Sequence, residues 1–177
     1  MIFDHITASW GRDETFSISG SSLSNITIQS SIISQGLQGH SAGGLVQTEG
    51  GVSILRTLYI DNDTRNAKVK GVNEYVNNVV CNWEAHGYIM GGDSDGEHWV
   101  NVFNNYFMRG PASSESVISL GNTDFHIYAT NNWYDGNRNG LLDGSDLQAE
   151  PLMVWPARDH LLDLLDRDLF VAHGGVP

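Results

Sequence analysis

Short segments rich in β-forming residues recur along this chain at intervals of 22 to 27 residues. Five of them are predicted to be extended, and an apolar segment at residues 1–9 precedes the first by about one interval. The five cover residues 25–33, 52–60, 74–80, 98–107 and 125–134. Extended segments that repeat at this period are typical of a solenoid with one coil per repeat. A β-sandwich would need turns about every 8–12 residues, and leucine-rich repeats would need a regular ladder of leucines, which are sparse before Leu141.

A pair of consecutive asparagines recurs in the last three segments, each pair 27 residues after the one before. The pairs are Asn77-Asn78, Asn104-Asn105 and Asn131-Asn132. Equivalent residues of a parallel solenoid stack from coil to coil, so recurrent side-chain amides can donate and accept hydrogen bonds along the stack. Asparagine also tolerates left-handed backbone angles. The repeat therefore predicts an asparagine ladder at one bend of each coil.

The length of the chain is typical of one domain, which we expect to cover residues 1–177. Residues 1–135 are predicted to form the coils, and residues 136–156 an irregular segment punctuated by glycine and proline. Residues 157–173 place leucines among aspartates and arginines, and Gly174-Gly175 follows. This pattern predicts a C-terminal amphipathic helix that packs on the solenoid or caps its end.

Charge and hydropathy exclude several classes of partner. The net charge of −12 argues against nucleic acid, because contacts to phosphate need a basic face. No apolar run reaches about 18 residues, so we expect no membrane-spanning segment. The first residues lack the pattern of a signal peptide. The single cysteine, Cys81, excludes a disulfide within the chain and is expected to be a small buried hydrophobe.

Basic residues gather in one part of this acidic chain. Four of the nine lie within fifteen positions, and they include both lysines: Arg56, Arg65, Lys68 and Lys70. Such a cluster predicts either a site for an anionic ligand or a stretch of solvated surface, and composition alone leaves both alternatives open.

Four segments carry a resemblance to a known family. They are residues 3–14 (FDHITASWGRDE), 25–29 with 34–37 (NITIQ and SQGL), 65–71 (RNAKVKG) and 74–83 (EYVNNVVCNW). In this order and spacing they resemble the pectate lyases of polysaccharide lyase family 1, and the similarity extends over residues 2–135. The resemblance implies an all-β fold, a right-handed single-stranded parallel β-helix. It also implies a secreted enzyme that cleaves polygalacturonate or a related acidic polysaccharide by β-elimination.

The resemblance also implies roles for the basic residues. Arg65 stands at the position of the family's arginine base, which removes the proton from C5 of a uronate. Lys70 stands where the family has a second arginine, and it would keep the charge without the bidentate fork. Lys68, His40 and Arg56 are expected to bind the substrate.

A calcium ion is the cofactor that the resemblance implies. Asp13 matches the first residue of an acidic pair in the family, and Glu14 is a second candidate ligand, but Ser17 replaces the other member of the pair. Calcium takes 6–8 oxygen ligands, so these residues predict a weak site.

A second acidic segment, residues 135–146, places oxygen-bearing side chains with a spacing similar to that of an EF-hand loop. The segment before it is predicted to be a strand rather than a helix, and Asp146 takes the place of the final glutamate. A turn-rich connection is the preferred interpretation, and calcium binding is the alternative.

Three hypotheses on function follow from the sequence. The first is an active pectate lyase that uses Arg65 with Ca²⁺. The second is a weak or inactive homologue that binds carbohydrate, and the third is a structural solenoid without activity. An uncapped first coil would present unpaired strand edges, which predicts a homo-oligomer formed through that coil.

Overall fold

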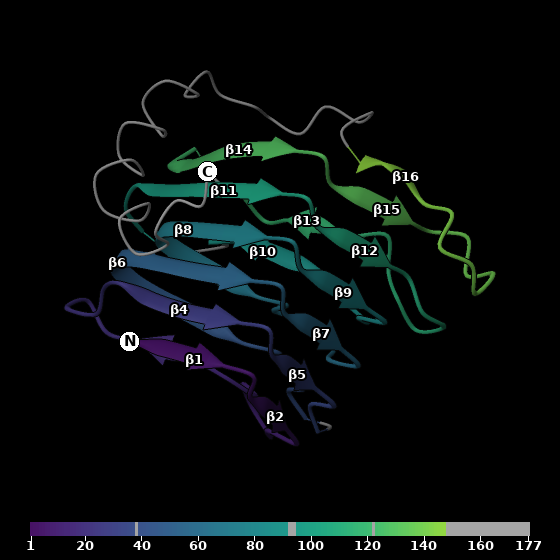
Figure 1. Cartoon of the computed structure of the whole chain (residues 1–177), viewed down its shortest axis with the longest axis horizontal. Coiled ribbons are helices and arrows are strands. Elements are labelled where there is room, and N and C mark those ends of the chain that lie inside the picture. The colour runs from purple at the N-terminus through teal and green to yellow at the C-terminus, as the bar shows by residue number, and fades with distance from the viewer. Residues whose placement is uncertain (38, 92–94, 122, 148–177) are drawn as a thin grey trace.

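A computed structural model describes residues 1–37, 39–91, 95–121 and 123–147 of the chain. Its strands wind into a parallel β-solenoid in which the coils follow one another from β1 to β15 (Figure 1). The all-β parallel solenoid predicted from the repeat is therefore confirmed. The predicted C-terminal helix at residues 157–173 lies outside the described residues.

Each coil contributes to three stacks of parallel strands. The first stack contains β3 (Ile18–Ser19), the start of β6 (Leu45–Leu55), the start of β8 (Lys68–Val76), β10 (Tyr88–Met90) and β13 (Ile118–Ser119). The second contains β1 (Ile2–Asp4), β4 (Ile26–Gln29), the ends of β6 and β8, β11 (His98–Phe103) and β14 (Phe125–Thr130). The third contains β2 (Thr7–Ser9), β5 (Ile32–Ser34), β7 (Leu58–Ile60), β9 (Val79–Cys81), β12 (Tyr106–Met108) and β15 (Trp133–Asp135).

The predicted extended segments each hold two strands separated by a bend. Segment 25–33, for example, contains β4 and the start of β5, with Ser30 between them at a φ of 49°. The same left-handed bend joins the second and third stacks in all six coils, with φ between 49° and 58°. The bend residues are His5, Ser30, Arg56, Asn77, Asn104 and Asn131. A single residue in this conformation turns the chain sharply without interrupting the hydrogen bonds between coils.

The asparagine ladder is confirmed, and the two asparagines of each pair have different structural roles. The first takes the left-handed bend, while the second is fully buried and hydrogen-bonded along the stack. Asn78 Nδ2 donates to Asn105 Oδ1 at 3.1 Å, and Asn105 Nδ2 donates to Asn132 Oδ1 at 3.0 Å. Each amide also donates to a backbone carbonyl of the preceding coil.

The interior is filled by rows of stacked apolar side chains. The inward row of the second stack is at most 5% exposed and consists of Ile28, Ile54, Tyr75, Val102 and Ala129. Large aromatics widen the middle of the core, where the rings of Tyr75 and Tyr88 lie 4.8 Å apart. Because the side chains of a strand alternate between its two faces, the residues between those of the inward rows point outward.

Three details differ from the expectation or refine it. Within the predicted irregular segment 136–156, β16 (Ser145–Asp146) pairs with β15 in antiparallel fashion. Cys81 is half-buried rather than fully buried. Its partial burial and, to a smaller extent, the nearby Asp61 carboxylate raise the pKa of its thiol. Strands β1 and β2 lie at the edges of their sheets, and Met1, Ile2 and Trp10 are exposed beside them.

Candidate active site

Arg65 lies in the turn that leads from the third stack into β8, in the left-handed region at a φ of 55°. The buried residue that follows it, Asn66, fixes this turn from the inside. Asn62 donates to the Asn66 side-chain oxygen at 3.0 Å, and the Tyr75 hydroxyl donates to the Asn66 carbonyl at 2.7 Å. Burial and its tyrosine neighbours raise the pKa of Tyr75, so this hydroxyl stays a donor.

A glycine in the preceding coil lets the backbone approach this turn closely. A Cβ on Gly43 would lie 2.8 Å from the Arg65 carbonyl oxygen and 2.8 Å from the Asn66 side-chain oxygen. The next amide, that of Gly44, donates to the Arg65 carbonyl at 2.7 Å. Any side chain at position 43 would therefore push the Arg65 turn away from its neighbour.

The guanidinium of Arg65 forms an ion pair with Glu14, which comes from two coils earlier. Parallel bridges align Glu14 with Ala42 and Ala42 with Thr64, so one coil separates the partners. That coil carries only Ala42, Gly43 and Gly44 at this point. The small side chains leave room for Glu14 and Arg65 to meet across the coil, where they are 14% and 22% exposed.

The two predicted metal ligands take different partners. The Asp13 carboxylate lies 3.0 Å from His40 Nδ1, and both side chains are largely exposed. Glu14 is occupied by Arg65. Ser17, at the position of the family's second acid, accepts a hydrogen bond from the Leu45 amide at 3.2 Å.

These residues do not fit a calcium site built by the protein alone. The described part of the chain contains no group of three or more His, Cys, Asp or Glu side chains that could hold a metal ion. Asp13 is then the one carboxylate of the predicted set that does not pair with an arginine. One carboxylate falls far short of the six to eight oxygens that calcium takes.

The predicted cationic residues on β8 lie beside Arg65. Lys68 and Lys70 alternate with Val69, which is 1% exposed and belongs to the core, so both lysines point to the outer side of the first stack. Lys70 Nζ lies 3.2 Å from a carboxylate oxygen of Glu49. Both lysines thus lie on the strand that the Arg65 turn leads into.

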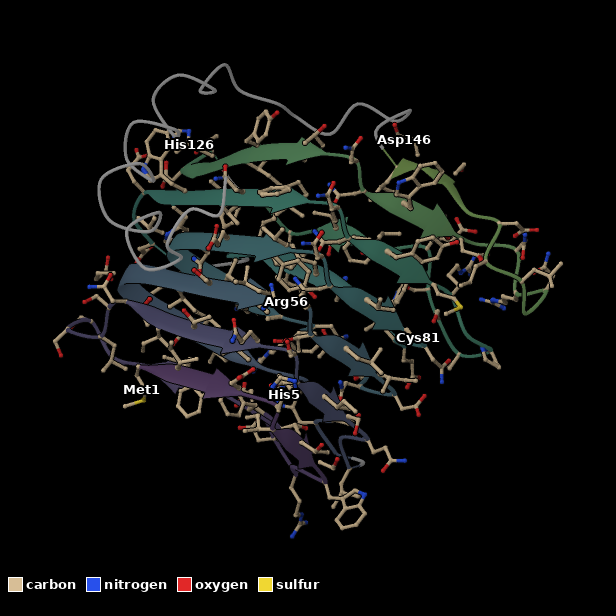
Figure 2. All side chains as sticks on the ribbon, in the orientation of Figure 1. Met1, His5, Arg56, Cys81, His126 and Asp146 are labelled. Carbon is tan, nitrogen blue, oxygen red and sulfur yellow. The ribbon has the colours of Figure 1, made fainter. Side chains whose placement is uncertain are left out.

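Arg56 lies elsewhere. It occupies the bend between β6 and β7, on the line of bends that also holds His5 (Figure 2). Its guanidinium donates to Gln29 Oε1 at 3.1 Å and to Ser30 Oγ at 3.4 Å. Strand β7 separates this bend from the Arg65 turn, so the structure does not bring Arg56 into the same site.

The acidic segment 135–146 forms the loop between β15 and β16, as the turn-rich interpretation predicted. Asn137 and Asn139 donate to the two oxygens of Asp143 at 2.7 and 2.9 Å. The hydrogen bond from Asn139, and next the one from Asn137, lower the pKa of Asp143. Asp135 is buried and accepts a hydrogen bond from the Tyr106 hydroxyl at 3.4 Å.

Sequence reasoning missed the polar residues that support Arg65, namely Asn62, Asn66, Tyr75 and His86. The sequence pattern around Asn62 indicates a different role, because Asn62-Asp63-Thr64 is a glycosylation sequon. The Asn62 side chain is 1% exposed and inaccessible to such a modification. The buried roles of the others depend on contacts between coils, which the sequence alone does not reveal.

Curated proteins named "Probable pectate lyase C" match this chain closely. The protein from Neosartorya fischeri is 60% identical over 147 residues, those from Aspergillus flavus and Emericella nidulans 59% and 58%. The matches cover 83% of this chain and 34–35% of each relative. Over the matched residues the chain is homologous to proteins named as pectate lyases. This confirms the relationship inferred from the motifs.

The chain spans about a third of the length of these curated relatives. No family model matches it, and no solved structure gives a significant match. Among its described residues, no helix is long and apolar enough to cross a membrane.

Proposed function

We propose that this chain carries the catalytic face of a lyase that cleaves polygalacturonate by β-elimination. The observation that carries the proposal is the turn that holds Arg65, which a buried network fixes directly ahead of the strand that carries Lys68 and Lys70. An acidic protein repels a polyanion, so a local cationic face is a requirement for binding one. Homology to proteins named as pectate lyases supports a polyuronate as this anion.

In the proposed reaction, a base removes the proton from C5 of a uronate. The electron pair forms a C4=C5 double bond, the C4–O bond breaks, and the departing sugar oxygen takes a proton. The neighbouring carboxylate carries negative charge in the transition state, and positive groups fixed beside it lower the barrier. Arg65, Lys68 and Lys70 would supply that charge.

The base role of Arg65 depends on its partner. The Glu14 carboxylate engages the guanidinium of Arg65 in an ion pair. We therefore expect the substrate to displace Glu14 before Arg65 acts as the base. Once released from Glu14, a guanidinium that keeps its proton would instead stabilise charge and orient the substrate carboxylate through its fork of donors.

Calcium remains a proposal in a specific form. A uronan brings its own carboxylates, and these could complete the coordination of an ion that Asp13 holds weakly. His40 Nδ1 lies 3.0 Å from the Asp13 carboxylate. His40 would therefore contact either Asp13 or the sugar when the uronan is bound. An ion held in this way would neutralise the substrate carboxylate.

A carbohydrate-binding homologue without turnover is the second candidate. Two observations favour it: the Arg65–Glu14 ion pair and the lack of a metal-binding cluster in the described residues. In either case we propose an extracellular location, where pectate is found. Association of two copies through the exposed edge of β1 and β2 also stays a prediction.

Incubation with polygalacturonate distinguishes the two candidates. The unsaturated product absorbs in the ultraviolet, and its formation is followed with added calcium and with a chelator. We expect product with calcium and little with chelator. Binding of the polymer without product under either condition would select the second candidate, and an equal response to a neutral polygalactose would contradict both.

A further inference from the structure

The turn that follows Arg65 along the solenoid presents a histidine on the same face. Asn66 binds this turn twice: its backbone amide donates to the Gly87 carbonyl at 2.9 Å, and its side-chain amide donates to the His86 carbonyl at 3.2 Å. His86 therefore lies one coil beyond Arg65. Adjacent coils are separated by about 4.8 Å, so the two residues are close neighbours along the stack.

Two serines hold the imidazole of His86. Its Nδ1 lies 2.9 Å from Ser116 Oγ and 3.1 Å from Ser119 Oγ. Strand pairing aligns Ser119 with Ile89 and Ile89 with Lys68, so Ser119 continues the outward row that contains Lys68. The ring is thus anchored on the outer side of the first stack and not in the core.

The second ring nitrogen is left for a ligand. A hydroxyl that donates to Nδ1 fixes the tautomer with a proton on Nε2. Nε2 has no hydrogen-bond partner among the described residues. It is also not one of the fully buried polar atoms without a partner, so some of its surface is accessible. A half-buried imidazole with one nitrogen anchored and the other unused is arranged to hydrogen-bond a ligand through Nε2, which is the donor when a serine hydroxyl donates to Nδ1.

We propose that His86 forms a uronate-binding subsite one coil beyond Arg65, in which Nε2 donates to a carboxylate or hydroxyl of the sugar next to the scissile bond. The inference rests on the proposed function, since it takes the polyuronate as the ligand. The serines act as positioning residues, because they orient the imidazole and do not reach the sugar. The subsite extends the cationic face of Arg65, Lys68 and Lys70 along the solenoid axis.

Calorimetric titration with trigalacturonate tests the subsite directly, with steady-state kinetics on polygalacturonate beside it. H86A should weaken binding about tenfold, as expected for the loss of one hydrogen bond to a charged group. Its KM should rise in parallel, and kcat should change less. H86Q, which keeps an amide donor, should recover part of the affinity, and S116A/S119A, which keeps the imidazole but removes its anchors, should weaken binding.

His5 provides the matched control, because it is an exposed histidine on a bend between the second and third stacks. H5A should bind and turn over like the unsubstituted chain. Unchanged affinity and KM in both H86A and H86Q would overturn the subsite while leaving the proposed function standing. Failure of the unsubstituted chain to bind trigalacturonate would overturn both.

Discussion

Arg65 and Glu14 meet across a coil whose side chains are too small to separate them. The pair is partly buried, so its charges are screened less than those of an ion pair exposed at the surface. Glu14 thus has two competing interpretations, as a metal ligand from the sequence and as the partner of Arg65 from the geometry. These interpretations differ in how calcium should affect the activity.

Replacing Glu14 with glutamine tests which interpretation holds. Glutamine keeps an oxygen acceptor for Arg65 but removes the charge. If Glu14 serves Arg65, E14Q should leave the calcium concentration for half-maximal rate unchanged while the maximal rate shifts. A rise of about tenfold or more in that concentration would show that Glu14 is a calcium ligand.

Ser17 is the residue at which a stronger calcium site could be restored. It stands four residues after Asp13, at the position of the family's second acid, and S17D adds a carboxylate there. We expect S17D to tighten calcium binding measured by titration calorimetry in the presence of trigalacturonate. S19D places the same charge two residues further along β3 and serves as the control. Equal affinities for S17D and the unsubstituted chain would contradict the prediction.

Among the elements, the asparagine ladder has the clearest energetic role. Asn105 donates to Tyr75 and Asn132 and accepts from both the backbone and the side chain of Asn78. Alanine at this position leaves several buried polar groups without partners. Each such group costs about 1–3 kcal/mol, so we expect N105A to lower the free energy of unfolding by roughly 2–5 kcal/mol.

The neighbouring asparagine supplies the control for that prediction. Asn104 takes a φ of 58°, which glycine adopts freely. N104G should therefore change the free energy of unfolding by less than about 1 kcal/mol. Urea denaturation measures both variants, and equal losses for N105A and N104G would show that the bend, rather than the buried amide, holds the coils.

The second and third stacks could be predicted from the sequence, whereas the first could not. The asparagine pairs mark the bend between β8 and β9 and the two bends that follow, and the 27-residue spacing fixes their alignment. Strands β3, β10 and β13 have only two or three residues each, too few to show an alternating pattern. The site lies against this unpredicted stack, so family resemblance identified Arg65 while its supports Asn66 and Tyr75 went unrecognised.

At the scale of the whole molecule, three tyrosines in the core tie stability to pH. Burial raises the pKa of Tyr59, Tyr75 and Tyr88 above the ordinary value of 10.0. Their hydroxyls hold protons more tightly in the folded than in the unfolded chain. Unfolding above pH 10 therefore releases protons, and the free energy of unfolding should fall as pH rises beyond that value.

Tyr88 allows this coupling to be isolated. Its hydroxyl has no hydrogen-bond partner among the described residues, so Y88F removes a titrating group without breaking a bond. Y88F should match or exceed the original stability at pH 7 and lose stability less steeply above pH 10. Denaturant unfolding at a series of pH values measures both slopes, and identical slopes would contradict the account.

The solenoid thus divides the four basic residues that cluster in the sequence between two places, and only one of these is the proposed catalytic face. Comparison of R65A with R56A tests this claim most directly, because each variant removes one arginine from the same cluster in the sequence. Initial rates of unsaturated product formation from polygalacturonate are measured for both, with circular dichroism to confirm that each is folded. We predict that R65A abolishes the activity and that R56A retains it. Activity that survives in folded R65A would contradict the central claim.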